Sequence, residues 1–149
     1  MKVLVGEDET LIRLDLCEML RRAGLEVCAE ARDGSEAVEL ARSVEPDLAI
    51  LDVKMPRLDG IEAARRILDE RPIPIVIVSA FTEQALVQRA AEAGVFGYLA
   101  KPFRETDLLP AIATARARFD ELAAVRGQVD TLADALAKRA KRSSGPKGS

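Results

Sequence analysis

The feature that most constrains this chain is a regular alternation between short apolar runs and longer segments with helical spacing. The runs are Val3–Val5, Val27–Ala29, Leu48–Leu51, Ile75–Val78 and Tyr98–Leu99. Between them, apolar side chains recur every three or four residues, which is the period of an amphipathic helix. This alternation predicts an α/β domain with a parallel sheet and right-handed crossovers. The runs are continuously apolar, as expected for strands covered by helices on both faces.

Residues that start or end helices mark the segments between the runs. The first segment carries an apolar stripe and ends at Gly24, which is a good helix terminator. Its stripe consists of Ile12, Leu16, Met19, Leu20 and Ala23. The later helices are predicted after Gly34-Ser35, from Asp59-Gly60 to before Pro72, up to Gly94, and from about Glu105 onward.

Polar side chains follow four of the predicted strands, at the point where each strand ends. They are Glu7 and Asp8 after the first strand, Asp52 after the third, Ser79 after the fourth and Lys101 after the fifth. The carboxyl ends of parallel strands lie along one edge of a sheet, where ligands bind beside the point at which strand order reverses. We therefore expect these side chains to converge in one crevice.

The chemistry of this set favours a phosphoryl group carried on a carboxylate. Neighbouring carboxylates raise one another's pKa unless a cation lies among them. The chain has no histidine, so the site offers hard oxygen ligands, which suit Mg²⁺ or Mn²⁺. In this interpretation Asp52 is the nucleophile, Lys101 neutralises the phosphate oxygens and Ser79 bonds to one of them.

Other interpretations of the same residues remain open or are disfavoured. Glu7-Asp8-Glu9 taken alone could be an acidic helix start. An aspartate-nucleophile phosphatase requires a second acid two residues after Asp52, where this chain has Lys54. A nucleotide-binding protein would have a glycine-rich loop after the first strand, and "GEDETL" is not one. The two cysteines, Cys17 and Cys28, fit no metal spacing and are expected to be buried as small hydrophobes.

Over residues 1–119 the chain resembles the receiver domain of two-component response regulators. The resemblance rests on the acidic pair Glu7-Asp8, on "LDVKMPRLDG", on Ser79-Ala80 and on "YLAKPF". It implies a doubly wound, flavodoxin-like five-stranded parallel sheet of order 2-1-3-4-5. It also implies that Asp52 accepts a phosphoryl group from a partner histidine kinase and that the domain then switches conformation. Such a domain is not an enzyme beyond slow autodephosphorylation.

The resemblance also implies a metal site. In this family Mg²⁺ would be held by Glu7, by Asp8 partly through water, by Asp52 and by the backbone carbonyl of Lys54. A pseudo-receiver, which binds partners without taking phosphate, is the alternative.

The same resemblance implies a switch and an unusual peptide bond. Ser79 and Tyr98 occupy the positions at which a hydroxyl and an inward-turning aromatic ring report the phosphate in this family. Lys101-Pro102 matches a peptide bond that is usually cis, although cis is found in only about 5–6% of X–Pro bonds of folded proteins.

The helical pattern that begins near Glu105 continues past the end of the receiver. Apolar side chains then recur at alternating spacings of 3 and 4 at Leu122, Val125, Val129, Leu132 and Leu136. This spacing is the a/d seam of a coiled coil. We therefore expect residues 120–140 to form an amphipathic coiled-coil helix and a weak homodimer. The alternative is a helix that folds back on its own receiver. Residues 141–149 are expected to be a basic disordered tail.

The output is constrained less. "EDETLIRLDLCEML", "DVKMPRLDGIEAA" and "KPFRETDLLPAI" resemble the receiver and coiled-coil part of ANTAR-type antiterminator regulators, whose RNA-binding part this sequence lacks. Nucleic acid would therefore be bound only through a missing C-terminal domain, and the chain is either a fragment or a stand-alone receiver. A net charge of -3 argues against whole-surface nucleic-acid binding, and no apolar run approaches the ~18 residues of a membrane span. A cytoplasmic location is expected.

Overall fold

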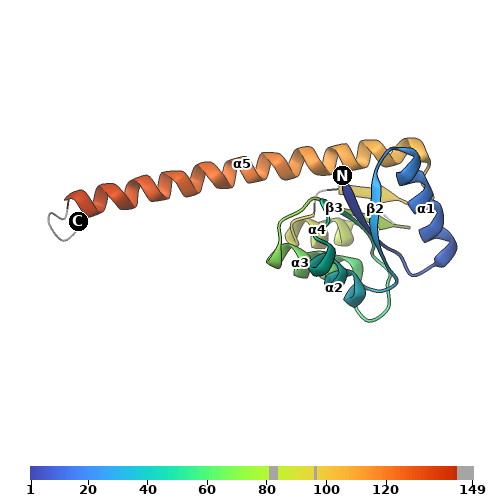
Figure 1. The fold of residues 1–149 in the computed structure, drawn as a ribbon. Helices are drawn as coiled ribbons and strands as arrows, with labels where there is room; N and C mark the ends of the chain where they lie inside the picture. Colours follow the sequence, from blue (N-terminus) through green and yellow to red (C-terminus); the bar gives the residue numbers. More distant parts are fainter. Residues whose placement is uncertain (81–83, 96, 144–149) are drawn as a thin grey trace. The chain divides into compact units, whose positions relative to one another are not determined.

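The computed structural model describes residues 1–80, 84–95 and 97–143, with side chains described as far as residue 124. The strands are β1 (Lys2–Gly6), β2 (Glu26–Ala31), β3 (Leu48–Asp52), β4 (Ile75–Ser79) and β5 (Gly97–Ala100). The helices are α1 (Thr10–Arg22), α2 (Gly34–Val44), α3 (Gly60–Glu70), α4 (Gln84–Glu92) and α5 (Glu105–Ser143). Strands and helices alternate along the chain as predicted (Figure 1).

The strands form one parallel sheet of order β2-β1-β3-β4-β5, which confirms the predicted topology. The order reverses between β1 and β3, which are hydrogen-bonded neighbours in register from Val3 opposite Leu48. The crossover from β1 to β2 runs to one side and every later crossover runs to the other. The carboxyl ends of β1 and β3 therefore lie beside the topological switch point.

Each face of the sheet is covered by its own apolar cluster. One cluster joins the sheet to α2, α3 and α4, and its helical members include Val38, Ile61 and Ile67. The other joins the sheet to α1 and the first part of α5, through residues such as Leu20 and Leu108. Strands covered on both faces have few exposed side chains, and all five residues of β3 are buried.

Two glycines allow the loop after β3 to pack tightly. A Cβ on Gly60, the first residue of α3, would lie 2.0 Å from the carbonyl oxygen of Asp52. A Cβ on Gly34, the first residue of α2, would lie 2.0 Å from the carbonyl oxygen of Leu58. Only glycine permits these approaches. The chain that follows Asp52 is therefore held between the first residues of two helices.

The buried face of α1 differs from the predicted stripe. The buried residues are Arg13, Leu16, Cys17 and Leu20, whereas Ile12 is only half-buried. An arginine therefore takes a place on the face that packs against the sheet, because its guanidinium finds polar partners there. Burial of Cys17 is confirmed, while Cys28 is half-buried and its thiol donates to the Val3 carbonyl at 3.4 Å.

By contact density the chain divides into two units, Met1–Arg116 and Ala117–Ser149, and α5 contributes to both. In the first unit α5 buries Leu108, Ile112 and Ala115. The helix continues past residue 140 to Ser143, into the segment predicted as a tail. Alanine, lysine and arginine favour helix, and after residue 140 the first strong helix breakers in the sequence are Gly145-Pro146.

Most of the predicted coiled-coil stripe lies outside the described side chains. Of its members only Leu122 is described, and it is 36% exposed. Residues 144–149, the greater part of the predicted tail, lie outside the described residues altogether. Within the described part of the chain, no helix combines the length and the apolar character that crossing a bilayer requires.

Candidate functional site

Three carboxylates meet at the carboxyl edge of the sheet. Glu7 and Asp8 follow β1, and Asp52 is the last residue of β3. One oxygen from each lies within 4.8 Å of the others. Glu7 and Asp52 are 2% and 7% exposed, whereas Asp8 is exposed to solvent. The structure thus brings together the acidic residues that the sequence placed at separate strand ends.

Lys101, which directly follows β5, reaches into this cluster. Its Nζ donates to Asp52 Oδ2 at 2.6 Å and to Glu7 Oε1 at 2.9 Å. Its backbone amide donates to the Ser79 carbonyl at 2.8 Å, so the end of β4 supports the position of the lysine. The peptide bond between Lys101 and Pro102 is cis. One ammonium group therefore lies between two buried acids.

The electrostatics of the cluster call for more positive charge than Lys101 supplies. Burial and the neighbouring Asp52 raise the pKa of Glu7 to about 8, despite the opposing effect of Lys101. Glu7 Oε2 is buried and accepts no hydrogen bond. Burial would lower the pKa of Lys101, but its bonds to Asp52 and Glu7 outweigh this and raise it. A divalent cation with oxygen ligands fits this donor set, because it would ionise Glu7 and use the oxygen that now has no partner.

The loop after Asp52 is shaped around that residue. The backbone amide of Lys54 donates to Asp52 Oδ1 at 3.2 Å, and the Val53 amide donates to the Val78 carbonyl at 3.0 Å. Asp59 caps α3 by accepting from the Glu62 amide at 2.8 Å, as its Asp-Gly sequence predicts. The two oxygens of Asp52 therefore have different partners, one from the loop and one from Lys101.

Ser79 and Tyr98 lie around a small pocket between the sheet and α4. The pocket is lined by Val53, Ile77, Ser79, Leu86, Val87, Tyr98 and Leu99. The Tyr98 hydroxyl donates to the Val87 carbonyl on α4 at 2.7 Å. Burial raises the pKa of Tyr98. The two residues predicted as a switch therefore share one pocket, and the ring is tied to α4.

Sequence reasoning missed one residue that contacts the site. Arg13 of α1 is buried, and its Nη1 donates to the backbone carbonyl of Glu7 at 2.8 Å. Its Nε donates to Glu30 Oε1 on β2 at 3.3 Å. The sequence allows two overlapping stripes on this helix, one through Ile12 and one through Arg13, and spacing alone does not choose between them.

Comparison with known proteins identifies the family to which this fold belongs. The model of a family described as the response regulator receiver domain matches residues 3–113. The chain belongs to this family. Receivers are the signal-accepting domains of two-component response regulators. The chain is therefore a two-component response regulator.

Individual relatives agree with this assignment. The chain is 54% identical over 138 residues to the transcriptional regulatory protein PdtaR of Mycobacterium tuberculosis, which covers 93% of this chain and 67% of PdtaR. It is 35% identical to the chemotaxis protein CheY of Thermotoga maritima, covering 74% of this chain and 93% of CheY. The receiver domain of the response regulator NarL from Mycobacterium tuberculosis superimposes with a TM-score of 0.71 at 35% identity, covering 75% of this chain and 92% of that one.

Proposed function

We propose that Asp52 accepts a phosphoryl group from a phosphohistidine of a partner kinase, in a reaction that requires a divalent cation. The observation that carries the proposal is the position of Lys101, whose Nζ bridges Asp52 and Glu7 at the edge of the sheet. The chain has no histidine, so the donor belongs to another protein. Slow hydrolysis of the phosphoaspartate is the only enzymatic activity that we assign to this chain.

The residues around Asp52 have distinct roles in the transfer. A carboxylate oxygen of Asp52 attacks phosphorus, the bond to the histidine nitrogen breaks, and the imidazole of the partner leaves with its electron pair. Lys101 neutralises charge on the transferred group, since it already contacts Asp52 Oδ2. The hydroxyl of Ser79, at the end of β4, bonds to a phosphate oxygen. Positioning and charge neutralisation supply most of the catalysis of phosphoryl transfer.

The proposed metal is Mg²⁺, with Mn²⁺ as a substitute. Glu7, Asp8 and Asp52 would hold it directly or through water, and the backbone carbonyl of Lys54 would complete the protein ligands. Support comes from the close approach of the three carboxylates and from the buried Glu7 oxygen that has no hydrogen-bond partner. When bound, the ion supplies the charge needed to bring phosphate beside three acids.

The proposed switch runs through the pocket that Ser79 and Tyr98 line. Movement of the Ser79 hydroxyl toward phosphate would make room for the Tyr98 ring. The ring would then give up its bond to the Val87 carbonyl, which now ties it to α4. Phosphorylation at β3 would in this way release α4 from β5.

The proposed output lies beyond the receiver. We assign residues 1–119 to the receiver, 120–140 to a coiled-coil helix that forms a weak homodimer, and 141–149 to a basic tail. The similarity to PdtaR extends over 93% of this chain, so it includes part of α5 beyond the receiver. By analogy with ANTAR-type antiterminators, residues 1–149 would not bind nucleic acid themselves, and a C-terminal domain would do so. The protein would act in the cytoplasm.

Phosphorylation with a small-molecule donor tests the central proposal. With Mg²⁺ and acetyl phosphate, the chain should gain one hydroxylamine-labile phosphoryl group, and Asp52→Asn should gain none. The matched control is Asp59→Asn, which removes a carboxylate that lies in the same loop but outside the cluster of Glu7, Asp8 and Asp52. This variant should be labelled like wild type. Labelling of Asp52→Asn, or labelling that persists in excess chelator, would contradict the proposal.

Sedimentation across a range of concentrations tests the homodimer. Two heptads are few, so association should be weak, with a dissociation constant on the order of micromolar. Leu132→Glu should abolish it. A strict monomer that the substitution does not change would favour a helix that folds back on its own receiver.

A further inference from the structure

Arg13 breaks the pattern of the helix on which it lies. The other buried residues of α1 that face the sheet are Leu16, Cys17 and Leu20. The guanidinium of Arg13 lies among them, and its side chain is only 10% exposed. A buried charge is costly unless it is paired and hydrogen-bonded. A charged residue on a helix face that is otherwise apolar often marks a functional site.

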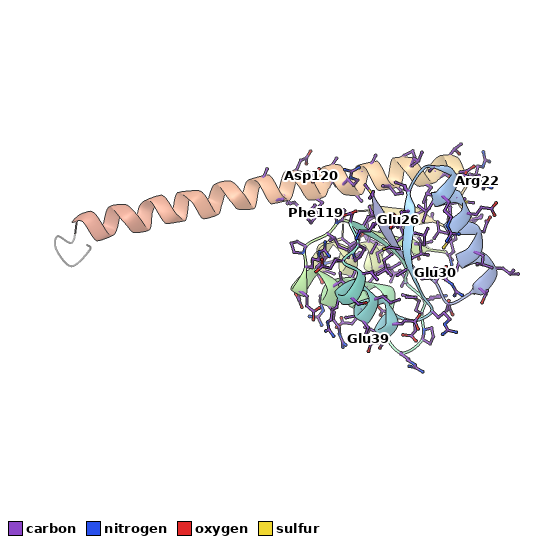
Figure 2. The ribbon with its side chains drawn as sticks, viewed as in Figure 1. Arg22, Glu26, Glu30, Glu39, Phe119 and Asp120 are labelled. Carbon is purple, nitrogen blue, oxygen red and sulfur yellow. The ribbon has the colours of Figure 1, made fainter. Side chains whose placement is uncertain are left out.

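The partners of Arg13 explain how the charge is tolerated. Its Nε pairs with Glu30 Oε1 at 3.3 Å, and Glu30 lies on β2 on the side of α1 (Figure 2). The same Glu30 carboxylate contributes, after burial, to raising the pKa of the Cys17 thiol to about 11. Glu30 therefore interacts with both Arg13 and Cys17 between α1 and β2. This pairing neutralises the guanidinium but leaves its other nitrogens available.

The second contact of Arg13 is with the backbone between two of the proposed metal ligands. Its Nη1 donates to the carbonyl of Glu7 at 2.8 Å, and this carbonyl belongs to the peptide unit that joins Glu7 to Asp8. The amide of Glu7 donates to the Ala31 carbonyl on β2 at 2.9 Å. Glu7 is thus fixed on both sides of its Cα, by β2 through its amide and by α1 through its carbonyl.

We infer that Arg13 is a positioning residue for the divalent cation. By holding the peptide between Glu7 and Asp8, it fixes the direction in which both carboxylates leave the end of β1. Asp8 is exposed, so no packing around its side chain orients it. The direction of its carboxylate therefore depends most on this peptide. The inference rests on the proposed metal site at Glu7, Asp8 and Asp52.

Two substitutions of Arg13 can distinguish this positioning role from simple packing of α1. Arginine can bond to the Glu7 carbonyl and to Glu30 at the same time, because its guanidinium presents several donors in a fixed plane. Lysine keeps the charge, but its single ammonium group pairs with the Glu30 carboxylate in preference to the neutral Glu7 carbonyl. Methionine keeps the apolar stem and the helix propensity but neither bond. Arg13→Lys and Arg13→Met therefore separate the charge of the side chain from the bond to Glu7.

Titration with Mg²⁺ tests the inference on the full chain. Binding is measured by calorimetry, and the folded state is checked by circular dichroism and thermal melting. The matched control is Arg22→Met, because Arg22 lies on the same helix (Figure 2). Arg22 is exposed and pairs with Glu18 and Glu105. Arg13→Met should weaken Mg²⁺ binding by about 10-fold, Arg13→Lys by less, and Arg22→Met not at all.

Phosphorylation by acetyl phosphate adds a second readout. Arg13→Met should need more Mg²⁺ for half-maximal labelling, while its labelling rate at saturating Mg²⁺ stays close to that of wild type. A merely structural arginine would lower the melting temperature without moving the Mg²⁺ requirement, and that result would overturn the inference. If Arg13→Met does not fold, wild-type Mg²⁺ affinity in a folded Arg13→Lys would overturn it as well. Absence of Mg²⁺ binding by wild type would instead overturn the metal site, and the inference with it.

Discussion

Two helices on the same face of the sheet, α3 and α4, are attached to it very differently. The helix α3 buries Gly60, Ile61, Ala63, Ala64 and Ile67, and its first residue lies against the carbonyl of Asp52. The helix α4 buries only Ala90. Both helices follow strands that end at the functional site, so the difference is not one of location. It lies in how much apolar surface each helix places against the strands.

Two polar contacts add to the small apolar attachment of α4. The Tyr98 hydroxyl bonds to the carbonyl of Val87, and Arg89 pairs with Asp59, the residue that caps α3, at 3.0 Å. Both contacts are exposed and each contributes little free energy. Elements with few buried contacts are the ones that open or shift at low cost. The comparison indicates that α3 holds Asp52 in place while α4 is free to respond.

The strongest test of α3 as the fixed element is Gly60→Ala. The new Cβ would lie 2.0 Å from the Asp52 carbonyl, so backbone must move. We expect a loss of about 4 kcal/mol in the free energy of unfolding, near the upper end for point substitutions. Urea unfolding measures it. A loss below about 1 kcal/mol would show that the start of α3 adapts easily, and would contradict the conclusion that α3 is the fixed element.

Truncation of one apolar side chain on each helix sharpens the contrast. Ile67 of α3 is 2% exposed, and Ile67→Ala should cost about 3 kcal/mol. Leu86 of α4 is half-buried against the same cluster, and Leu86→Ala should cost about 1 kcal/mol, because less surface returns to water. The two variants are compared in parallel urea titrations. Equal losses would mean that α4 is anchored as firmly as α3.

Removing the Tyr98 hydroxyl should loosen α4 alone. Tyr98→Phe deletes the bond to the Val87 carbonyl and should lower the local opening free energy of α4 amides by about 1 kcal/mol. Native-state hydrogen exchange measures this effect. Amides of α3 in the same sample are the internal control, and their protection should not change. A uniform loss over both helices would show that the hydroxyl supports the whole face.

The smallest expected effect is that of Arg89→Ala. The pair between Arg89 and Asp59 is exposed on both sides and should be worth about 0.5 kcal/mol or less. Hydrogen exchange in α4 should be slightly faster in the variant than in wild type. This difference should disappear as salt is raised, because salt screens the ion pair in wild type. Arg66→Ala, which removes a longer contact to Glu62 within α3, is the control that should leave α4 unchanged.

The candidate site shows where prediction from sequence worked and where it failed. Glu7, Asp8, Asp52 and Lys101 could be placed together because each lies at or just past the end of a strand, and parallel strands end at one edge. Arg13 could not, because its role depends on the exact rotation of α1 over the sheet. The apolar residues of α1 suggested a stripe through Ile12, and the packed helix turned Arg13 inward instead.

The amino-acid sequence alone was enough to predict the α/β alternation, the helix start at Asp59-Gly60 and the polar chemistry at the strand ends. These are local properties, since the period of apolar residues and the capping side chain act within a few residues. Three other features emerged only in the folded structure: which oxygens of Glu7 and Asp52 contact Lys101, which face of α1 is buried, and how little apolar surface α4 buries against the sheet. Those outcomes depend on close packing between segments far apart in the chain, and spacing along the sequence carries no record of it.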